Sequence, residues 1–226
     1  MCGRFTLLSD QQVLEKIFGV TGGYSLDWKP HYNIAPSQTI PIIRPDGRGG
    51  REFAPVRWGL VPQWARDPSV GARMINARAE TLREKPAFRA AFKRRRCVVP
   101  ASGWYEWQAT AQGKQPWYFH PRDGAPLAFA GLWERRDDPA TGPLETATII
   151  TVEANPALAA IHDRMPALLD ADGVARWLDP NLETPEPLQE LLHPVVEGII
   201  AGRRVGRAVG NVKNDGPGLI EAMKGE

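Results

Sequence analysis

Hydrophobic and polar positions alternate in short runs along most of the chain, a pattern typical of strands rather than of long helices. Two such runs, at 39–44 and 52–58, flank Pro45-Asp46-Gly47 and predict a β-hairpin. From residue 97 onwards, runs separated by turn residues predict strands at 97–100, 104–108, 117–120, 127–133 and 146–153. A last strand is expected at 205–212, where small and apolar residues alternate with polar ones.

Apolar positions three and four residues apart predict a few short helices between these strands. The first would be capped by Ser9 or Asp10 and stopped by Gly19, with an inward face of Val13, Leu14, Ile17 and Phe18. A second would begin at Pro86 and end in a basic run at 93–96, which favours the helix dipole. Smaller helices are expected at 157–161, 174–178 and 185–192, the last capped by Thr184. Short strands with peripheral helices predict one α+β domain over residues 1–226, with mostly antiparallel sheet.

Composition adds limits to this picture without changing it. The 226 residues are 42% hydrophobic and 24% charged, as in ordinary soluble globular proteins. No apolar run is long enough to span a membrane, and no secretory signal is present at the start, so we expect a cytoplasmic protein with no membrane partner. The two cysteines predict no disulfide framework, and the four scattered histidines predict no metal site. No phosphate-cradling glycine motif is present, so we expect no cofactor.

Charge and aromatic content point weakly to nucleic acid. The net charge is only +2 and the pI about 8.6, below the pI of about 9 that marks a nucleic-acid binder. Basic residues nevertheless cluster at 93–96, 135–136 and 203–207, and the chain holds eight tryptophans. Aromatic rings that stack bases and cations that hold phosphates suit single-stranded nucleic acid. The alternative is that the basic runs are solvated surface and the tryptophans belong to the core.

The first residues, Met1-Cys2-Gly3-Arg4-Phe5, carry the most distinctive chemistry. If Met1 is removed, Cys2 becomes the terminus and offers an α-amine beside its thiol. Such a 1,2-aminothiol can condense with an aldehyde to a Schiff base and then close a thiazolidine ring. The α-amine has an ordinary pKa of about 7.7–8.0, so it is partly neutral and nucleophilic near pH 7. The alternative is a frayed chain end with no role.

Other polar residues stand in apolar surroundings. Glu106 lies between Tyr105 and Trp107, so its pKa is expected to rise toward a value useful for proton transfer, unless it lies on an exposed edge strand. His162 ends a short helix and is either an acid–base group or a helix cap. Asn76 and Arg78 share one face of an extended segment, and an amide with a guanidinium suits a sugar and a phosphate.

Seven ordered motifs together resemble the SOS-response-associated peptidase (SRAP) family, the abasic-site processing proteins. They run from the first residue to about residue 214, and the resemblance extends to about residue 220. The motifs are 1–5, 32–36, 57–62, 76–81, 103–107, 161–166 and 209–214. The resemblance implies a barrel-like fold and a covalent sensor of abasic sites in single-stranded DNA, whose opened deoxyribose is an aldehyde. It leaves open whether the lesion lies at a junction with double-stranded DNA.

By the same resemblance, four residues are catalytic and seven contact DNA. Cys2 would form a thiazolidine crosslink, Asn76 would bind the sugar, Glu106 would handle protons at the amine, and His162 would act as acid or base. The resemblance places the DNA-contacting residues at Arg4, Arg78, Arg164, Trp107, Pro36, Ser37 and Trp64. It also implies lyase-type chemistry, with Met1 removed either by the protein itself, as a peptidase, or by an aminopeptidase. We expect a monomer that associates with the nucleoid when bound to DNA.

Two other classes of protein remain open from the residues alone. Amidotransferases that hydrolyse glutamine with a terminal cysteine also begin Met-Cys-Gly, although Arg4-Phe5 departs from their usual continuation. A module that binds single-stranded DNA without covalent chemistry would need the arginines and tryptophans but not Cys2. Cys97 is interpreted as a buried structural thiol, and Trp58, Trp133 and Trp177 as core residues.

Overall fold

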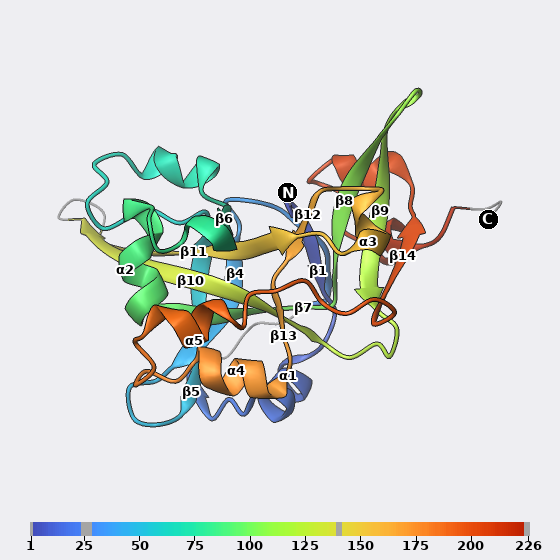
Figure 1. The fold of residues 1–226 in the computed structure, drawn as a ribbon. Coiled ribbons are helices and arrows are strands. Elements are labelled where there is room, and N and C mark those ends of the chain that lie inside the picture. The colour runs from blue at the N-terminus through green and yellow to red at the C-terminus, as the bar shows by residue number, and fades with distance from the viewer. Residues whose placement is uncertain (1, 24–28, 139–141, 224–226) are drawn as a thin grey trace.

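The computed structural model describes residues 2–23, 29–138 and 142–223, and its helices lie at the periphery of two sheets (Figure 1). The strands are β1 Phe5–Leu7, β2 Gly22–Gly23, β3 His31–Ile34, β4 Thr39–Pro45, β5 Arg51–Trp58, β6 Asn76–Arg78, β7 Arg96–Ala101, β8 Gly103–Thr110, β9 Gly113–Pro121, β10 Leu127–Asp138, β11 Gly142–Glu153, β12 Arg164–Pro166, β13 Leu168–Leu169 and β14 Ile200–Arg204. The helices are α1 Gln11–Phe18, α2 Pro86–Arg94, α3 Pro156–Ala159, α4 Ala171–Trp177 and α5 Pro185–Gln189, with 3-10 turns at 68–73, 79–81, 207–210 and 217–220.

Five strands of the larger sheet close into a barrel. Within the described residues, β5 pairs with β4, β4 with β7, β7 with β10 and β10 with β11, all antiparallel. A parallel pairing of β11 with β5, at Thr146 opposite Arg57, completes the ring. Where β11 pairs with β5, neither strand has an unpaired edge. The closed barrel contributes buried residues to the core, among them Trp58, Phe129 and Ile149. The predicted α+β class with mostly antiparallel strands and a barrel is confirmed.

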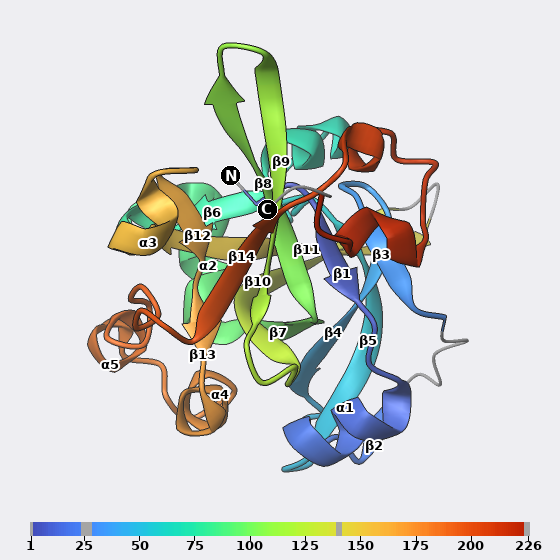
Figure 2. The same ribbon diagram turned by 90° about the vertical axis from the view of Figure 1, so that its right-hand side faces the viewer.

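A second sheet packs beside the barrel in the order β14, β9, β8, β1, β3 among the described strands. Its central strand is β8, and β1 joins the chain start to it: Phe5 pairs with Trp104, and the Tyr105 N–H donates to the Arg4 carbonyl at 3.0 Å. Because β7 ends at Ala101 and β8 begins at Gly103, this sheet is tied directly to the barrel wall. The β8–β9 hairpin continues beyond the body of the molecule (Figures 1 and 2).

Helix ends follow the sequence signals closely. Asp10 caps α1 by accepting from the Val13 N–H at 2.8 Å, and Gly19 ends it in a left-handed conformation with φ 63°. The basic run after α2 acts through a direct contact: buried Arg96 donates to the Phe92 and Lys93 carbonyls at 3.3 and 2.5 Å. Thr184 stands at the N-cap of α5, but its side chain makes no capping hydrogen bond.

Two expectations about packing and topology are wrong. Val13 and Ile17 of α1 are 40% and 50% exposed, and the buried residues of this helix are Leu14 and Phe18. The last strand is β14 at Ile200–Arg204, not 205–212, since a 3-10 turn occupies 207–210. Residues 205–220 instead contact β9 through the 207–210 turn and β3 through the 217–220 turn. Carbonyls of this segment accept hydrogen bonds from the Arg4 and Asn33 side chains. No helix among the residues described here is long and apolar enough to cross a membrane.

Of the tryptophans and the cysteine that were predicted to be buried, all but Trp133 are buried in the structure. Trp58, Trp177 and Cys97 are fully or almost fully buried, and burial raises the pKa of the Cys97 thiol, so it stays protonated and unreactive. Trp133 is only partly buried and carries the Arg44 guanidinium 4.2 Å above its ring centroid. Trp133 is therefore a shielded surface residue rather than a core residue.

Candidate functional site

The start of the chain is held inside the protein. Cys2 is completely buried, and the segment that follows it is fixed by β-pairing with β8, including a bond from the Ser102 N–H to the Thr6 carbonyl at 2.7 Å. The frayed-end interpretation of Cys2 is therefore wrong. Burial, and then the nearby Glu106 carboxylate, raise the pKa of the Cys2 thiol, so the sulfur is held as a thiol and not a thiolate. The fold therefore fixes Cys2 in a buried position near the Glu106 carboxylate.

Glu106 lies on the inner face of β8, two residues from the fully buried Trp104, while Tyr105 and Trp107 join a separate aromatic cluster on the other face. This is the alternation expected for a strand. Glu106 is itself almost completely buried, and burial raises the pKa of its carboxyl to about 7. At neutral pH the group is therefore poised between its acid and base forms, as a proton shuttle requires.

His162 meets Glu106 across the gap between α3 and β8. Its Nε2 lies 3.8 Å from Glu106 Oε2, and its Nδ1 accepts a hydrogen bond from the Arg164 backbone N–H at 3.0 Å. That bond assigns the proton of the neutral ring to Nε2, on the side of the carboxylate. Burial lowers the pKa of His162, so the neutral ring predominates at pH 7. The exposed Asp163 carboxylate, 3.0 Å from Nδ1, would favour the cation but is solvated.

Asn76 comes from β6, which runs parallel to β11 with Asn76 opposite Ile149. The N-terminal end of β1 lies among β6, β8 and β12 in both views (Figures 1 and 2). The Asn76 amide nitrogen reaches the Ile149 carbonyl at 3.4 Å, but its Oδ1 is buried without a hydrogen-bond partner among the described residues. A buried acceptor left unsatisfied costs about 1–3 kcal/mol, and a hydroxyl of a bound ligand would satisfy it.

A pocket of about 400 Å³ opens beside these groups. Its lining residues are Arg4, Glu106, Trp107, Lys114, His162 and Gly210. The structure thus brings together two of the predicted catalytic residues and two of the predicted DNA contacts, whereas Cys2 and Asn76 are not among the lining residues. Arg4 is fixed in the wall, because its Nη1 donates to Asn33 Oδ1 at 2.8 Å and to the Val209 carbonyl at 2.7 Å.

Lys114 and Asn33 also belong to this region, although neither was predicted as a site residue. Lys114 reaches the pocket only because the β8–β9 pairing places it opposite Ala109, two residues beyond Trp107, and no local motif marks it. Asn33 is buried and donates to three carbonyls of the wrapped C-terminal segment, at Val209, Asn211 and Asn214. It stands in the singled-out 32–36 motif, which is the signal that could have found it. Both the N-terminal segment and the pocket wall depend on this amide.

The other predicted DNA contacts differ in exposure. Arg78 is exposed, and Trp64 is 65% exposed on the loop that precedes β6. Pro36 and Ser37 form a turn in which Ser37 has φ 73°, an unusual value for a residue other than glycine. These four remain available to a ligand, and their role stays a prediction.

Arg164 is not available in the same way. Its guanidinium forms a bidentate pair with Glu80 at 2.8 and 3.0 Å and donates to the Thr151 carbonyl at 2.5 Å. The side chain is almost buried, so in this structure it joins β12 to the 79–81 turn. Whether this guanidinium also holds a DNA backbone is not tested by these contacts, and that role stays a prediction. In the described part of the chain, no group of three His, Cys, Asp or Glu side chains could hold a metal ion.

These features define a protein whose candidate centre is the buried Cys2, near the Glu106 carboxylate that lines a basic and aromatic pocket. The family model described as SOS response associated peptidase (SRAP) matches residues 1–212, and the chain belongs to this family. The resemblance inferred from the seven motifs is confirmed.

Relatives match almost the whole chain. It is 41% identical to the abasic site processing protein YoqW of Bacillus subtilis over 98% of this chain and 100% of that protein. It is also 41% identical to the abasic site processing protein YoaM of the same organism, over 98% of each chain. A crystal structure of a Bacteroides thetaiotaomicron protein is similar at 25% identity, with a TM-score of 0.88 over 98% of this chain and 100% of that one.

Proposed function

We propose that this protein recognises abasic sites in single-stranded DNA and forms a covalent crosslink to them through Cys2, after Met1 has been removed. One observation carries the proposal: the second residue of the chain is completely buried beside a carboxylate whose pKa is about 7. A protein that merely binds DNA has no need to bury its start beside a proton-transfer group. The similarity to abasic site processing proteins supports the choice of substrate.

The bond-forming steps follow from the aminothiol. The α-amine of Cys2 attacks C1 of the open-chain deoxyribose, and loss of one water leaves a Schiff base. The thiol then adds to the same carbon, its proton ends on the nitrogen, and a thiazolidine ring closes. Because the thiol pKa is raised, the sulfur must lose its proton during attack, which requires a base within reach. The protein is inert while Met1 blocks the amine.

Glu106 and His162 supply and accept the protons. Glu106 accepts a proton from the attacking amine and returns it to the departing oxygen, a cycle suited to a pKa of about 7. His162, neutral with its proton on Nε2, donates to the ring oxygen as the closed sugar opens. The 3.8 Å separation of the two groups allows a proton to return from Glu106 to His162 after small movements. Asn76 Oδ1 accepts a hydrogen bond from a sugar hydroxyl.

The DNA backbone and bases meet the residues around the pocket. Arg4 and Lys114 contribute positive charge at its wall, and Trp107 offers an aromatic surface. Arg78, Trp64, Pro36 and Ser37 extend the contact along the strand. Arg164 is also proposed to contact the DNA backbone, and its pair with Glu80 holds the segment next to His162 in place. We further propose one domain, a monomer located in the cytoplasm, and removal of Met1 by the protein itself.

The test mixes the purified protein with a single-stranded oligonucleotide that carries one abasic site and separates the products on a denaturing gel. A covalent band is expected, and it should vanish with Cys2→Ala and with an intact oligonucleotide. The matched control is Cys97→Ala, which removes the other thiol of the protein but keeps Cys2 and its α-amine. This variant should still give the covalent band. No band from protein with a free Cys2 would refute the proposal, and glutamine hydrolysis would favour an amidotransferase instead.

A further inference from the structure

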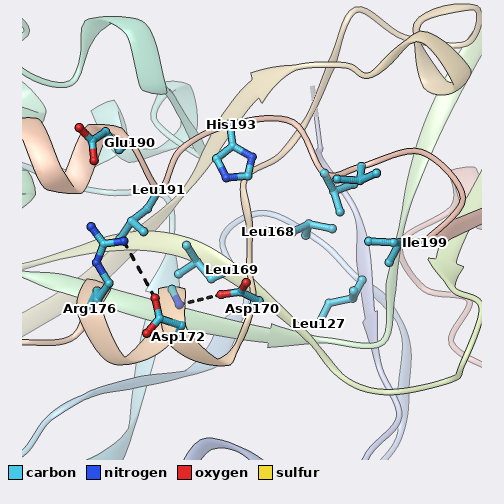
Figure 3. Close-up of a pocket in the computed structure, with 13 residues that line it drawn as sticks. Leu127, Leu168, Leu169, Asp170, Asp172, Arg176, Glu190, Leu191, His193 and Ile199 are labelled. Carbon is cyan, nitrogen blue, oxygen red and sulfur yellow. Dashed lines mark hydrogen bonds and ion pairs between the residues drawn. The ribbon is translucent and has the colours of Figure 1, made fainter.

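Outside the candidate site, a pocket of about 520 Å³ lies between α4 and the segment at 190–199 (Figure 3). It lies over β13, at the end of the molecule away from β6 and the β8–β9 hairpin (Figure 1). None of its lining residues lines the pocket beside His162. Whatever binds here can therefore bind while the candidate DNA site is occupied.

Part of its wall is apolar. Leu127, Leu168 and Leu169 contribute side chains to it, and in Figure 3 Leu168, Leu127 and Ile199 lie along one side of the pocket. Val196 is 70% exposed and Ile199 is 50% exposed at its edge. Branched apolar side chains gain about 1.5–3 kcal/mol each when fully removed from water. An apolar ligand would recover part of this free energy.

A second pocket, of about 410 Å³, adjoins the first and shares Leu127, Leu169, Asp170 and Ile199 with it. It is also lined by Ile17, the α1 residue whose sequence pattern predicts burial but which is half exposed. The two pockets together form a continuous surface, here called the apolar groove. Contiguous exposed apolar surface of this kind is typical of interaction sites.

Charge distinguishes the apolar groove from the DNA site. Its acidic residues are Asp123, Asp170, Asp172 and Glu190, and its basic residues are Arg51 and Arg176. Arg176 lies 4.0 Å from Asp172, and Arg51 donates to the Phe18 carbonyl at 2.6 Å, so both guanidiniums already have acceptors. The groove is thus net acidic in a chain of net charge +2. It repels phosphates and attracts cations.

The backbone beside the groove favours an extended ligand. β13 pairs with β10 at Ala128–Leu169 and Phe129–Leu168, and the described part of the chain places no strand on its other side. The free edge of a strand offers unpaired backbone groups to an added segment, while side-chain pockets on either side confer specificity.

We propose that the apolar groove docks an extended segment of a partner protein that carries two apolar side chains and at least one lysine or arginine. The apolar side chains enter the two pockets, and the cation pairs with Glu190, which takes no part in the ion pairs formed by the described residues. Such a segment would bring a partner to a protein held on DNA, because the two surfaces lie on different parts of the molecule.

The test selects binders to the full-length protein from a displayed library of random short peptides and measures synthetic versions by fluorescence polarisation. Enriched sequences are expected to combine two apolar residues with lysine or arginine. Val196→Ser with Ile199→Ser should weaken binding by roughly tenfold or more, since two apolar contacts are lost. Glu190→Lys should weaken it less and remove most of its salt dependence.

Two controls keep the result specific. Val13→Ser removes an exposed apolar residue from α1 without touching either pocket and should leave binding unchanged, whereas Ile17→Ser should weaken it. Abasic single-stranded DNA should not compete. The proposal is overturned if no sequence is enriched, if enriched peptides are acidic, if they bind the Val196→Ser/Ile199→Ser variant equally well, or if DNA displaces them.

Discussion

Replacement of Glu106 by glutamine should make the protein more stable at neutral pH. The carboxyl has a pKa of about 7 in the folded protein against 4.5 in an unstructured chain, because it is buried. Between these values the folded state binds more protons than the unfolded state, so stability falls as pH rises from 4.5 to about 7 and stays lower above it. Glutamine has the same shape but no charge to bury.

The size of the effect follows from the shift. A difference of roughly 2.5 pKa units corresponds to about 3 kcal/mol in favour of the glutamine variant above pH 7, and to none below about pH 4. For a chain of this length, that free energy raises the melting temperature by roughly 6–12 °C. Glu106→Gln should therefore unfold at higher temperature than the wild type at about pH 8, and the gap should close on acidification.

The assay is thermal unfolding of both proteins, followed by circular dichroism across this pH range. Glu134→Gln is the matched control, since Glu134 is also buried but is bonded to Arg95 at 2.7 and 2.8 Å. That variant loses an ion pair and should be less stable than the wild type. The reasoning about Glu106 fails if Glu106→Gln melts at the same or a lower temperature at neutral pH. A gain in stability with loss of crosslinking would mark Glu106 as a residue kept for function.

Three further variants test the roles of single side chains. Asn33→Ala removes bonds to Arg4 and to three carbonyls, and should lower the free energy of unfolding in urea by about 2–4 kcal/mol; an unchanged midpoint would contradict its bracing role. Arg164→Met breaks the pair with Glu80 and should cost about 1–3 kcal/mol, whereas a surface DNA contact would cost almost nothing. Trp64→Ala should change stability by less than about 0.5 kcal/mol because the ring is exposed, yet weaken DNA binding in a fluorescence titration; equal binding would remove Trp64 from the DNA surface.

Strands and the α+β class were predictable because alternation is a local signal and most strands here bury one face or both. The barrel was expected only from the resemblance to the SRAP family. Helix ends were predictable where a short polar side chain or a glycine decides them, as at Asp10 and Gly19. The sequence could not show which apolar residues of α1 are buried. Periodicity defines the apolar face of a helix but not which part of the protein packs against it. Ile17 lines the apolar groove and is half exposed.

The site was predictable in its chemistry more than in its geometry. Cys2, Glu106 and His162 stand out as reactive groups in unusual contexts, whereas Lys114 reaches the pocket only through the pairing of two strands. Arg164 was predicted as a site residue, but its pairing with Glu80 could not be predicted. An exposed guanidinium and one that is paired with Glu80 have the same sequence signature. The path of residues 205–220 depends on the Asn33 amide, a contact between segments more than 170 residues apart.

The most direct test of the central claim is the mass of the N-terminal peptide after reaction with an abasic oligonucleotide. Trypsin releases Cys2-Gly3-Arg4 from protein that has lost Met1, and this peptide should carry the sugar remnant with the loss of one water. It should also resist borohydride, as a closed thiazolidine does and an open Schiff base does not. Attachment of the sugar to Lys114, the other amine at the pocket, or an unmodified Cys2 peptide, would contradict the account.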